Sequence, residues 1–210
     1  MSDHDLTRGV AVRLSAFCLT EGGKLRRYDI WDVAVRAALL VDLALAGRVT
    51  HEEDSVVIDA IPTGFEPADR LLAPIAVEPE RPLDWWMDRG GVDLGDLVED
   101  NVASGRWHRH WTPLGRRYSL ADGGQRTSDA AELRRVPTTA AWDAPTAAVA
   151  LIGDTSGITD MRPGEPAAGI LEHTGDVRWL AQAVVEHLQE AHRRNLRQAG
   201  AADGVGSPYY

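Results

Sequence analysis

Residues 30–49, IWDVAVRAALLVDLALAGRV, decide how the rest of this chain must be arranged. Before Gly47 the stretch contains no glycine or proline, and its only charged residues are Asp32, Arg36 and Asp42. A helix that is apolar on nearly all sides must be surrounded by other elements, and this one is too short and too interrupted by charge for a membrane span. The stretch therefore predicts the central helix of a helical core, ended by Gly47.

The composition limits the fold and the partners. With 210 residues, of which 44% are hydrophobic, the chain can form one large domain or two small ones around a sizeable core. The net charge of -10 argues against broad, non-specific binding to nucleic acid or to an anionic membrane, so any anion binding must come from a local basic patch. The single cysteine, Cys18, excludes an internal disulfide framework and a multi-cysteine metal site.

Two further expectations concern compartment and origin. The opening sequence MSDHDLTRGV is polar and acidic and has no feature of a signal peptide, so the default compartment is the cytoplasm. Lys24 is the only lysine among 22 basic residues, which, with the abundance of Ala, Arg, Gly and Asp, indicates a GC-rich bacterial genome.

The remaining segments predict elements that ring the central helix. Apolar residues recur at helical spacing in residues 66–75, 83–89, 92–104, 128–136 and 176–198. Residues 48–61 and 106–120 predict hairpins, residues 10–20 a strand or short helix, and residues 154–169 a loop. We therefore expect a mainly α fold: a single domain over residues 10–198, with a central apolar helix, amphipathic helices around it and one or two β-hairpins. Residues 199–210 are predicted to be a disordered tail.

Four of these segments together resemble one protein family. In chain order they read ALLVDLALAGRV (38–49), DAIPTGFEPADRLL (59–72), LVEDNVASGRW (97–107) and HWTPLGRRYSLAD (110–122). From about Val10 to about Ile158 the chain is similar to the Golgi phosphoprotein 3 family, as an actinobacterial-type member. The eukaryotic members are Golgi-associated adaptors that bind phosphatidylinositol 4-phosphate and the cytosolic tails of membrane enzymes.

The resemblance implies a function without catalysis or cofactor. It implies a peripheral protein on the inner face of the cell membrane, with an anionic phospholipid headgroup and cytosolic tails of membrane proteins as partners. By this resemblance, the arginine of the family's headgroup site corresponds to Arg36 and its tryptophan corresponds to Trp31. Two further arginines of that site fall near Gly91 and Leu94, where this chain instead has carboxylates close by (Asp93, Asp96 and Glu99). A phosphate monoester is usually held by several hydrogen-bond donors. The resemblance therefore supports phosphoinositide binding by this chain less strongly than it supports the fold.

The two residues of the implied headgroup site each have a structural alternative. Arg36 either binds an anion or forms an ion pair with Asp32, which lies four residues earlier on the same helical face. Trp31 either contacts lipid or packs into the core beside the helix.

The second hairpin, residues 106–117, is the best local candidate for membrane contact. It combines arginines with an aromatic and an aliphatic residue, a combination that suits the region between headgroups and acyl chains. Its candidate contact residues are Arg109, Trp111, Pro113, Leu114, Arg116 and Arg117. The alternative is a hairpin that packs on its own domain or on a second subunit, which makes the protein a self-associating scaffold and a homo-oligomer.

Other functions find less support in the sequence. His108 and His110 share a strand face, but they have no third ligand and lie beside arginines, so we expect no metal site. Residues 32–61 loosely resemble a winged helix, but the acidic tip at residues 52–54 would repel phosphates, so no nucleic acid partner is expected. The chain has no nucleophile elbow, Walker loop or dinucleotide fingerprint, and we do not expect an enzyme.

Overall fold

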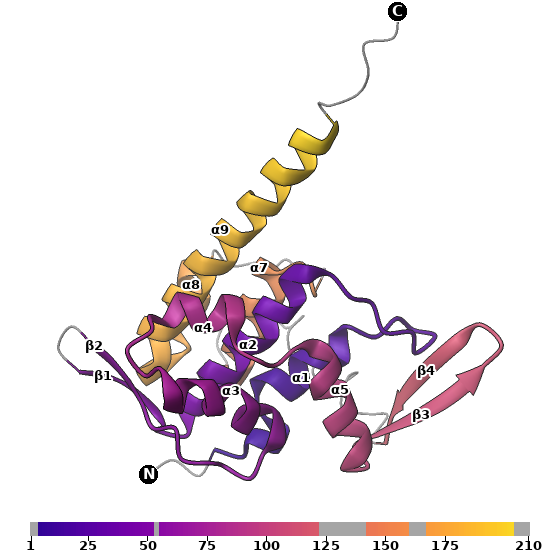
Figure 1. Cartoon of the computed structure of the whole chain (residues 1–210), viewed down its shortest axis with the longest axis horizontal. Coiled ribbons are helices and arrows are strands. Elements are labelled where there is room, and N and C mark those ends of the chain that lie inside the picture. The colour runs from indigo at the N-terminus through magenta and orange to yellow at the C-terminus, as the bar shows by residue number, and fades with distance from the viewer. Residues whose placement is uncertain (1–3, 53–54, 122–141, 160–166, 204–210) are drawn as a thin grey trace, which may run out of the picture.

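A single helix at the centre organises the fold. The computed structural model describes residues 4–52, 55–121, 142–159 and 167–203. In it, helix α2 (Asp29–Leu45) runs through the middle of the molecule, and every residue from Ala34 to Ala44 is buried (Figure 1). Gly47 follows the helix with a φ of 74°, a left-handed conformation that ends the helix as predicted.

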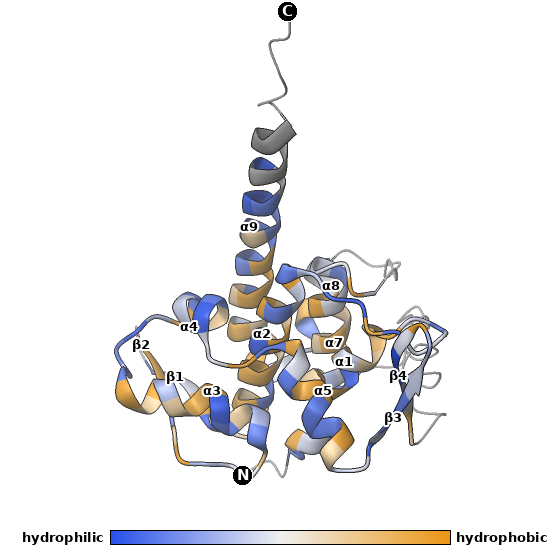
Figure 2. Ribbon diagram, turned by 45° about the vertical axis from the view of Figure 1, so that its right-hand side comes forward, coloured by the Kyte–Doolittle hydropathy of each residue, from blue (hydrophilic) through white to orange (hydrophobic). Residues whose placement is uncertain are grey.

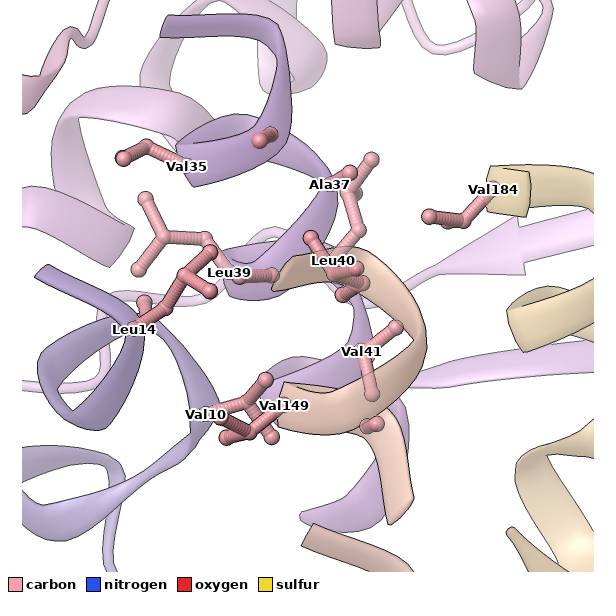
Figure 3. Close-up of a cluster of buried hydrophobic side chains, with 14 of the residues drawn as sticks. Val10, Leu14, Val35, Ala37, Leu39, Leu40, Val41, Val149 and Val184 are labelled. Atoms are coloured by element: carbon pink, nitrogen blue, oxygen red, sulfur yellow. The ribbon is translucent and has the colours of Figure 1, made fainter. Parts of the chain in front are cut away.

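Other helices surround α2. It contacts α1 (Val10–Phe17), α3 (Glu66–Val77), α4 (Leu83–Arg89), α5 (Leu94–Ala103), α7 (Ala144–Thr155) and α9 (Arg178–Asp203). Figure 3 shows the centre of this packing, where Val10 and Leu14 of α1, Val149 of α7 and Val184 of α9 meet the apolar residues of α2. Hydrophobic residues gather on α2 and α7 (Figure 2). Two short 3-10 helices (Leu6–Arg8 and Gly175–Val177) and helix α8 (Ala167–Glu172) complete the described helices.

The hydrogen bonds of Asp42 explain why a carboxylate lies inside an apolar helix. Its side chain is fully buried and accepts hydrogen bonds from the backbone N–H groups of Val10 at 2.7 Å and Ala11 at 2.9 Å. The ring of His4 lies 2.7 Å from the same carboxylate. Burial raises the pKa of Asp42, while the hydrogen bonds from His4 and the two N–H groups lower it. The carboxylate thus caps the start of α1 from a neighbouring helix.

Both predicted hairpins are present. Strand β1 (Val49–Glu52) pairs antiparallel with β2 (Ser55–Ile58), and β3 (Trp107–Thr112) pairs with β4 (Gly115–Leu120). The second pair is closed by a two-residue turn, since Thr112 is paired with Gly115. It protrudes from the helical body, at the right of Figure 1, with its turn farthest out. The mainly α, single-domain fold with two hairpins agrees with the sequence-based prediction.

Several boundaries differ from the expected ones. Residues 10–17 form a helix, one of the two alternatives predicted for residues 10–20. The expected loop at 154–169 is shorter because α7 continues to Thr155 and α8 begins at Ala167. The last helix begins at Arg178, after a 3-10 turn, and continues to Asp203, past the predicted domain end at residue 198. The helix expected at 128–136 and residues 204–210 lie outside the described residues. No described helix is both long and apolar enough to cross a bilayer.

Candidate functional site

Arg36 points into the protein and holds the end of α4. Its Nε donates to the carbonyl oxygen of Met87 at 2.5 Å, its Nη1 to that of Val92 at 3.0 Å, and its Nη2 to that of Asp88 at 3.1 Å. The residue is only 8% exposed. The last carbonyls of a helix have no partner within the helix, and Arg36 supplies partners for those of α4 and for the turn that follows.

The ion pair with Asp32, one of the two roles predicted for Arg36, is not formed within the described part of the chain. Asp32 Oδ1 instead accepts a hydrogen bond from the backbone N–H of Leu94 at 3.0 Å, at the start of α5. Burial lowers the pKa of Arg36, while the nearby charges of Asp32, Asp88 and Asp93 raise it. These carboxylates therefore compensate the buried guanidinium from a distance, and backbone carbonyls contact it directly.

Trp31 connects the start of α2 to the end of α7. It is buried, and its indole Nε1 donates to the carbonyl oxygen of Ser156 at 3.2 Å. Tyr28 meets its ring edge-on with centroids 4.8 Å apart, and the guanidinium of Arg26 lies 5.8 Å from the ring centroid. Headgroup binding at Trp31 and Arg36 stays a prediction. A phosphate that reached Arg36 would have to compete with three backbone carbonyls for its donors.

The carboxylates Asp93 and Asp96, at the start of α5, have structural roles. Asp93 caps α5, accepting from the N–H of Asp96 at 2.9 Å, while Asp96 accepts from the N–H of Asp93 at 3.0 Å. Arg27 pairs with Asp93 at 2.9 Å, and Arg70 pairs with Asp96 at 2.6 Å. Partial burial raises the pKa of Asp93, but the backbone hydrogen bonds and Arg27 outweigh this, and the net shift is downward. These acids therefore fix the start of α5 rather than forming a merely solvated face.

The tip of the β3–β4 hairpin, residues 111–116, is highly exposed. Trp111 is 73% exposed and Leu114 is 83% exposed, among the most exposed large hydrophobic residues described. Pro113, which precedes Leu114 in the turn, is exposed as well. The guanidinium of Arg116 lies 4.9 Å from the centroid of the Trp111 ring, across the strand pair. The tip therefore combines an apolar surface with a cation held against the aromatic ring.

The base of the same hairpin packs on its own domain. Trp107 and Tyr118 are buried, and their ring centroids are 6.1 Å apart. Arg109 pairs with Glu99 of α5 at 3.0 Å, and Arg106 pairs with Asp100 of the same helix. Arg109 is therefore tied to the domain, so packing on the domain accounts for the base of the hairpin and not for its tip.

Side chains alternate between the two faces of the hairpin. Trp111 and Arg116 share the face of the buried Trp107 and Tyr118, and Arg117 lies on the other face with His108 and His110. His110 Nε2 lies 2.9 Å from Ser119 Oγ. Within the described residues, no group of three or more His, Cys, Asp or Glu could hold a metal ion.

The connector between α1 and α2, residues 19–27, lies beside this hairpin. It turns back on itself through a bridge between Leu19 and Leu25, and the N–H of Thr20 donates to the carbonyl of Lys24 at 2.9 Å. At its turn, Gly23 accepts a hydrogen bond at 2.8 Å from the backbone N–H of Tyr118 in β4. The signal of this close approach in the sequence is the pair of glycines, Gly22 and Gly23.

One comparison with known proteins identifies the chain. A family model described as Golgi phosphoprotein 3 (GPP34) matches residues 17–199. The match runs from the end of α1 into α9 and includes the central helix and both hairpins. Searches found no matching curated protein and no matching solved structure. Since the match covers most of its length, the chain belongs to the Golgi phosphoprotein 3 (GPP34) family.

Proposed function

We propose that this protein is a non-enzymatic peripheral membrane protein that binds anionic phospholipid surfaces through the tip of its β3–β4 hairpin. The observation that carries the proposal is the exposure of Trp111 and Leu114 at the end of a protruding hairpin, beside Arg116 and Arg117. Family membership supports the same conclusion, because eukaryotic members of the family act at membrane surfaces.

The chemistry of the tip suits the boundary between headgroups and acyl chains. Transfer of Trp111 and Leu114 out of water is favourable by about 1.5–3 kcal/mol for each side chain that becomes fully buried. Arg116 and Arg117 pair with no carboxylate within the described residues. Arg117 Nη1 donates to the carbonyl oxygen of Arg116 at 3.4 Å, and the other donors of the two guanidinium groups are available to lipid phosphates. Each cation near an anionic surface contributes about 1 kcal/mol. Together these contributions favour reversible binding rather than permanent anchoring.

The overall charge favours an approach with the tip first. The chain has a net charge of -10, so an anionic surface repels most of the molecule. A protruding hairpin holds its own cations near the lipid and keeps the acidic body away from it. On this proposal the protein lies on the inner face of the cell membrane, and an adaptor role toward cytosolic tails of membrane proteins uses surfaces that remain free.

Vesicle co-sedimentation tests the proposal. The wild-type protein is expected to sediment with vesicles of phosphatidylcholine and phosphatidylglycerol and much less with phosphatidylcholine alone. Trp111→Ala with Leu114→Ala is expected to weaken binding at least about tenfold, because most of the apolar contact is lost. The matched control is Val77→Ala, which shortens a 78% exposed side chain at the end of α3 and is expected to bind like the wild type.

Self-association through the hairpin is the competing function. Under that alternative, Trp111→Ala with Leu114→Ala changes the molar mass of the protein in solution, measured by size-exclusion chromatography with light scattering. Vesicle binding is then absent in the wild type or unaffected by the variant. These two results together would reject the lipid proposal and show that the protein is a self-associating scaffold.

A further inference from the structure

We propose that the connector between α1 and α2 is a second membrane contact, in which Lys24 and Arg26 attract anionic headgroups beside the hairpin tip. This inference rests on the proposed function and adds a second binding element of different character. The hairpin tip supplies apolar insertion, whereas the connector supplies charge.

The connector is fixed against the hairpin rather than merely near it. The N–H of Tyr118 donates to the carbonyl oxygen of Gly23 at 2.8 Å, so the turn of the connector pairs with the outer edge of β4. A Cβ atom at Gly23 would lie 2.3 Å from the carbonyl oxygen of Tyr118, and Gly23 has a φ of 71°. Only glycine permits this approach without displacement. The loop joining α1 and α2 accordingly runs beside β4 in Figure 1.

The connector carries exposed cations that no described carboxylate neutralises through an ion pair. Lys24 and Arg26 are exposed, and neither forms an ion pair with a described carboxylate. Arg26 instead lies 5.8 Å from the centroid of the Trp31 ring. Arg27 is already engaged by Asp93, and Glu21 is the one acidic residue of the connector. Lys24 and Arg26 thus add exposed cations on a second segment that lies beside the hairpin.

The dimensions of the hairpin bring the connector close to the headgroups when the tip is inserted. Tyr118 lies four residues from Leu114, which corresponds to about 13 Å along a strand at about 3.3 Å per residue. Apolar groups of interfacial proteins enter the headgroup and acyl boundary by about 5–10 Å. The turn at Gly23 then lies within about 8 Å of the boundary, which is about one Debye length at physiological ionic strength. At that separation a negative surface still attracts the connector.

The arrangement predicts the kind of lipid that is recognised. The cations belong to two segments, and Lys24, Arg26 and Arg116 lie exposed at the surface. Such a surface responds to the density of negative charge and not to the stereochemistry of a single headgroup. The partner is therefore a bilayer rich in anionic lipid of any headgroup, distinguished from a zwitterionic bilayer.

Vesicle titration of a connector variant tests this inference. Lys24→Gln with Arg26→Gln is expected to weaken binding to phosphatidylglycerol-containing vesicles about 10- to 30-fold and to make it less sensitive to salt. The matched control is Arg8→Gln with Arg89→Gln, which removes the same charge from two exposed arginines elsewhere and is expected to weaken binding by less than about threefold. Circular dichroism melting of each variant checks that the fold is intact.

Two results would overturn the inference. One rejects the connector alone, and the other rejects the hairpin proposal as well. If the connector variant and its arginine control weaken binding equally, while Trp111→Ala with Leu114→Ala still weakens it at least about tenfold, the connector is rejected and the hairpin proposal stands. If the wild-type protein does not bind anionic vesicles, both proposals fail. A preference for one anionic headgroup over another at equal charge density would contradict the predicted lack of headgroup selectivity.

Discussion

The guanidinium Nε of Arg36 donates to the carbonyl oxygen of Met87 at 2.5 Å. This hydrogen bond connects the central helix α2 to the end of α4. Because two further carbonyls accept from the same side chain, we predict that Arg36→Met lowers the free energy of unfolding by about 3 kcal/mol. Arg36→Lys should recover little of this, since an ammonium cannot reproduce the planar fork. Urea denaturation measures both. An Arg36→Met variant with unchanged stability and lost vesicle binding would instead assign Arg36 to a lipid headgroup.

A second prediction concerns the buried carboxylate of α2. Asp42→Asn keeps the size of the side chain but turns an amide N–H₂ toward backbone donors of Val10 and Ala11. We expect the free energy of unfolding to fall by about 2 kcal/mol, the range for hydrogen bonds to a charged group. Hydrogen exchange should show the first turn of α1 opening more readily than α7. Equal exchange of α1 in the variant and the wild type would contradict the capping role.

The lowered pKa of Asp93 gives a prediction about pH. An acid whose pKa is lower in the folded state stabilises the fold above its unfolded pKa, near 3.8, and this contribution is lost as the pH falls through the folded pKa. Asp93→Ala should therefore cost about 1 kcal/mol at pH 7, as for other helix caps, and the difference from wild type should shrink below about pH 3.8. Glu80→Ala, at an exposed loop position, is the control. A difference that stays constant down to acid pH would argue against the ionised cap.

The contact between the connector and β4 can be tested through its glycine. Gly23→Ala forces a methyl group toward the Tyr118 carbonyl oxygen and a left-handed conformation on alanine, at a cost of about 1–2 kcal/mol. The amide of Tyr118 should then exchange its hydrogen faster. Gly22→Ala is a close control, because its added Cβ would have only the Thr20 hydroxyl within contact distance, at 4.0 Å. Similar exchange at Tyr118 in both variants would show that the connector does not depend on this approach.

Features that depend on local pattern could be predicted from the sequence. The apolar run before Gly47 predicted the central helix, and residues 106–120 predicted the protruding hairpin. The direction of Arg36 could not be predicted, because a helix that is apolar on all sides has no polar face to indicate where its one cation points. Its acceptors lie more than 50 residues away in the chain, at the end of α4.

The candidate site was predictable to a similar extent. Trp111 and Leu114 stood out because an aromatic and an aliphatic residue share a turn with arginines. The sequence could not predict that the base of the hairpin packs on the domain while its tip is exposed. The base is held by ion pairs to Glu99 and Asp100 of α5, which only the folded structure brings next to it. The approach of Gly23 to Tyr118 was also not visible, because only the folded chain brings these distant segments together.

Environment-sensitive fluorescence at the hairpin turn tests the central proposal most directly. Leu114→Cys can be labelled selectively, because the native Cys18 is buried. On vesicles containing phosphatidylglycerol, we predict that a polarity-sensitive dye at this position shifts to shorter wavelength and is quenched by quenchers attached to the lipid chains. The same dye at Val77→Cys should change little. Membrane-bound protein whose dye at position 114 remains in a polar environment, with no quenching from the lipid chains, would contradict insertion of the hairpin tip.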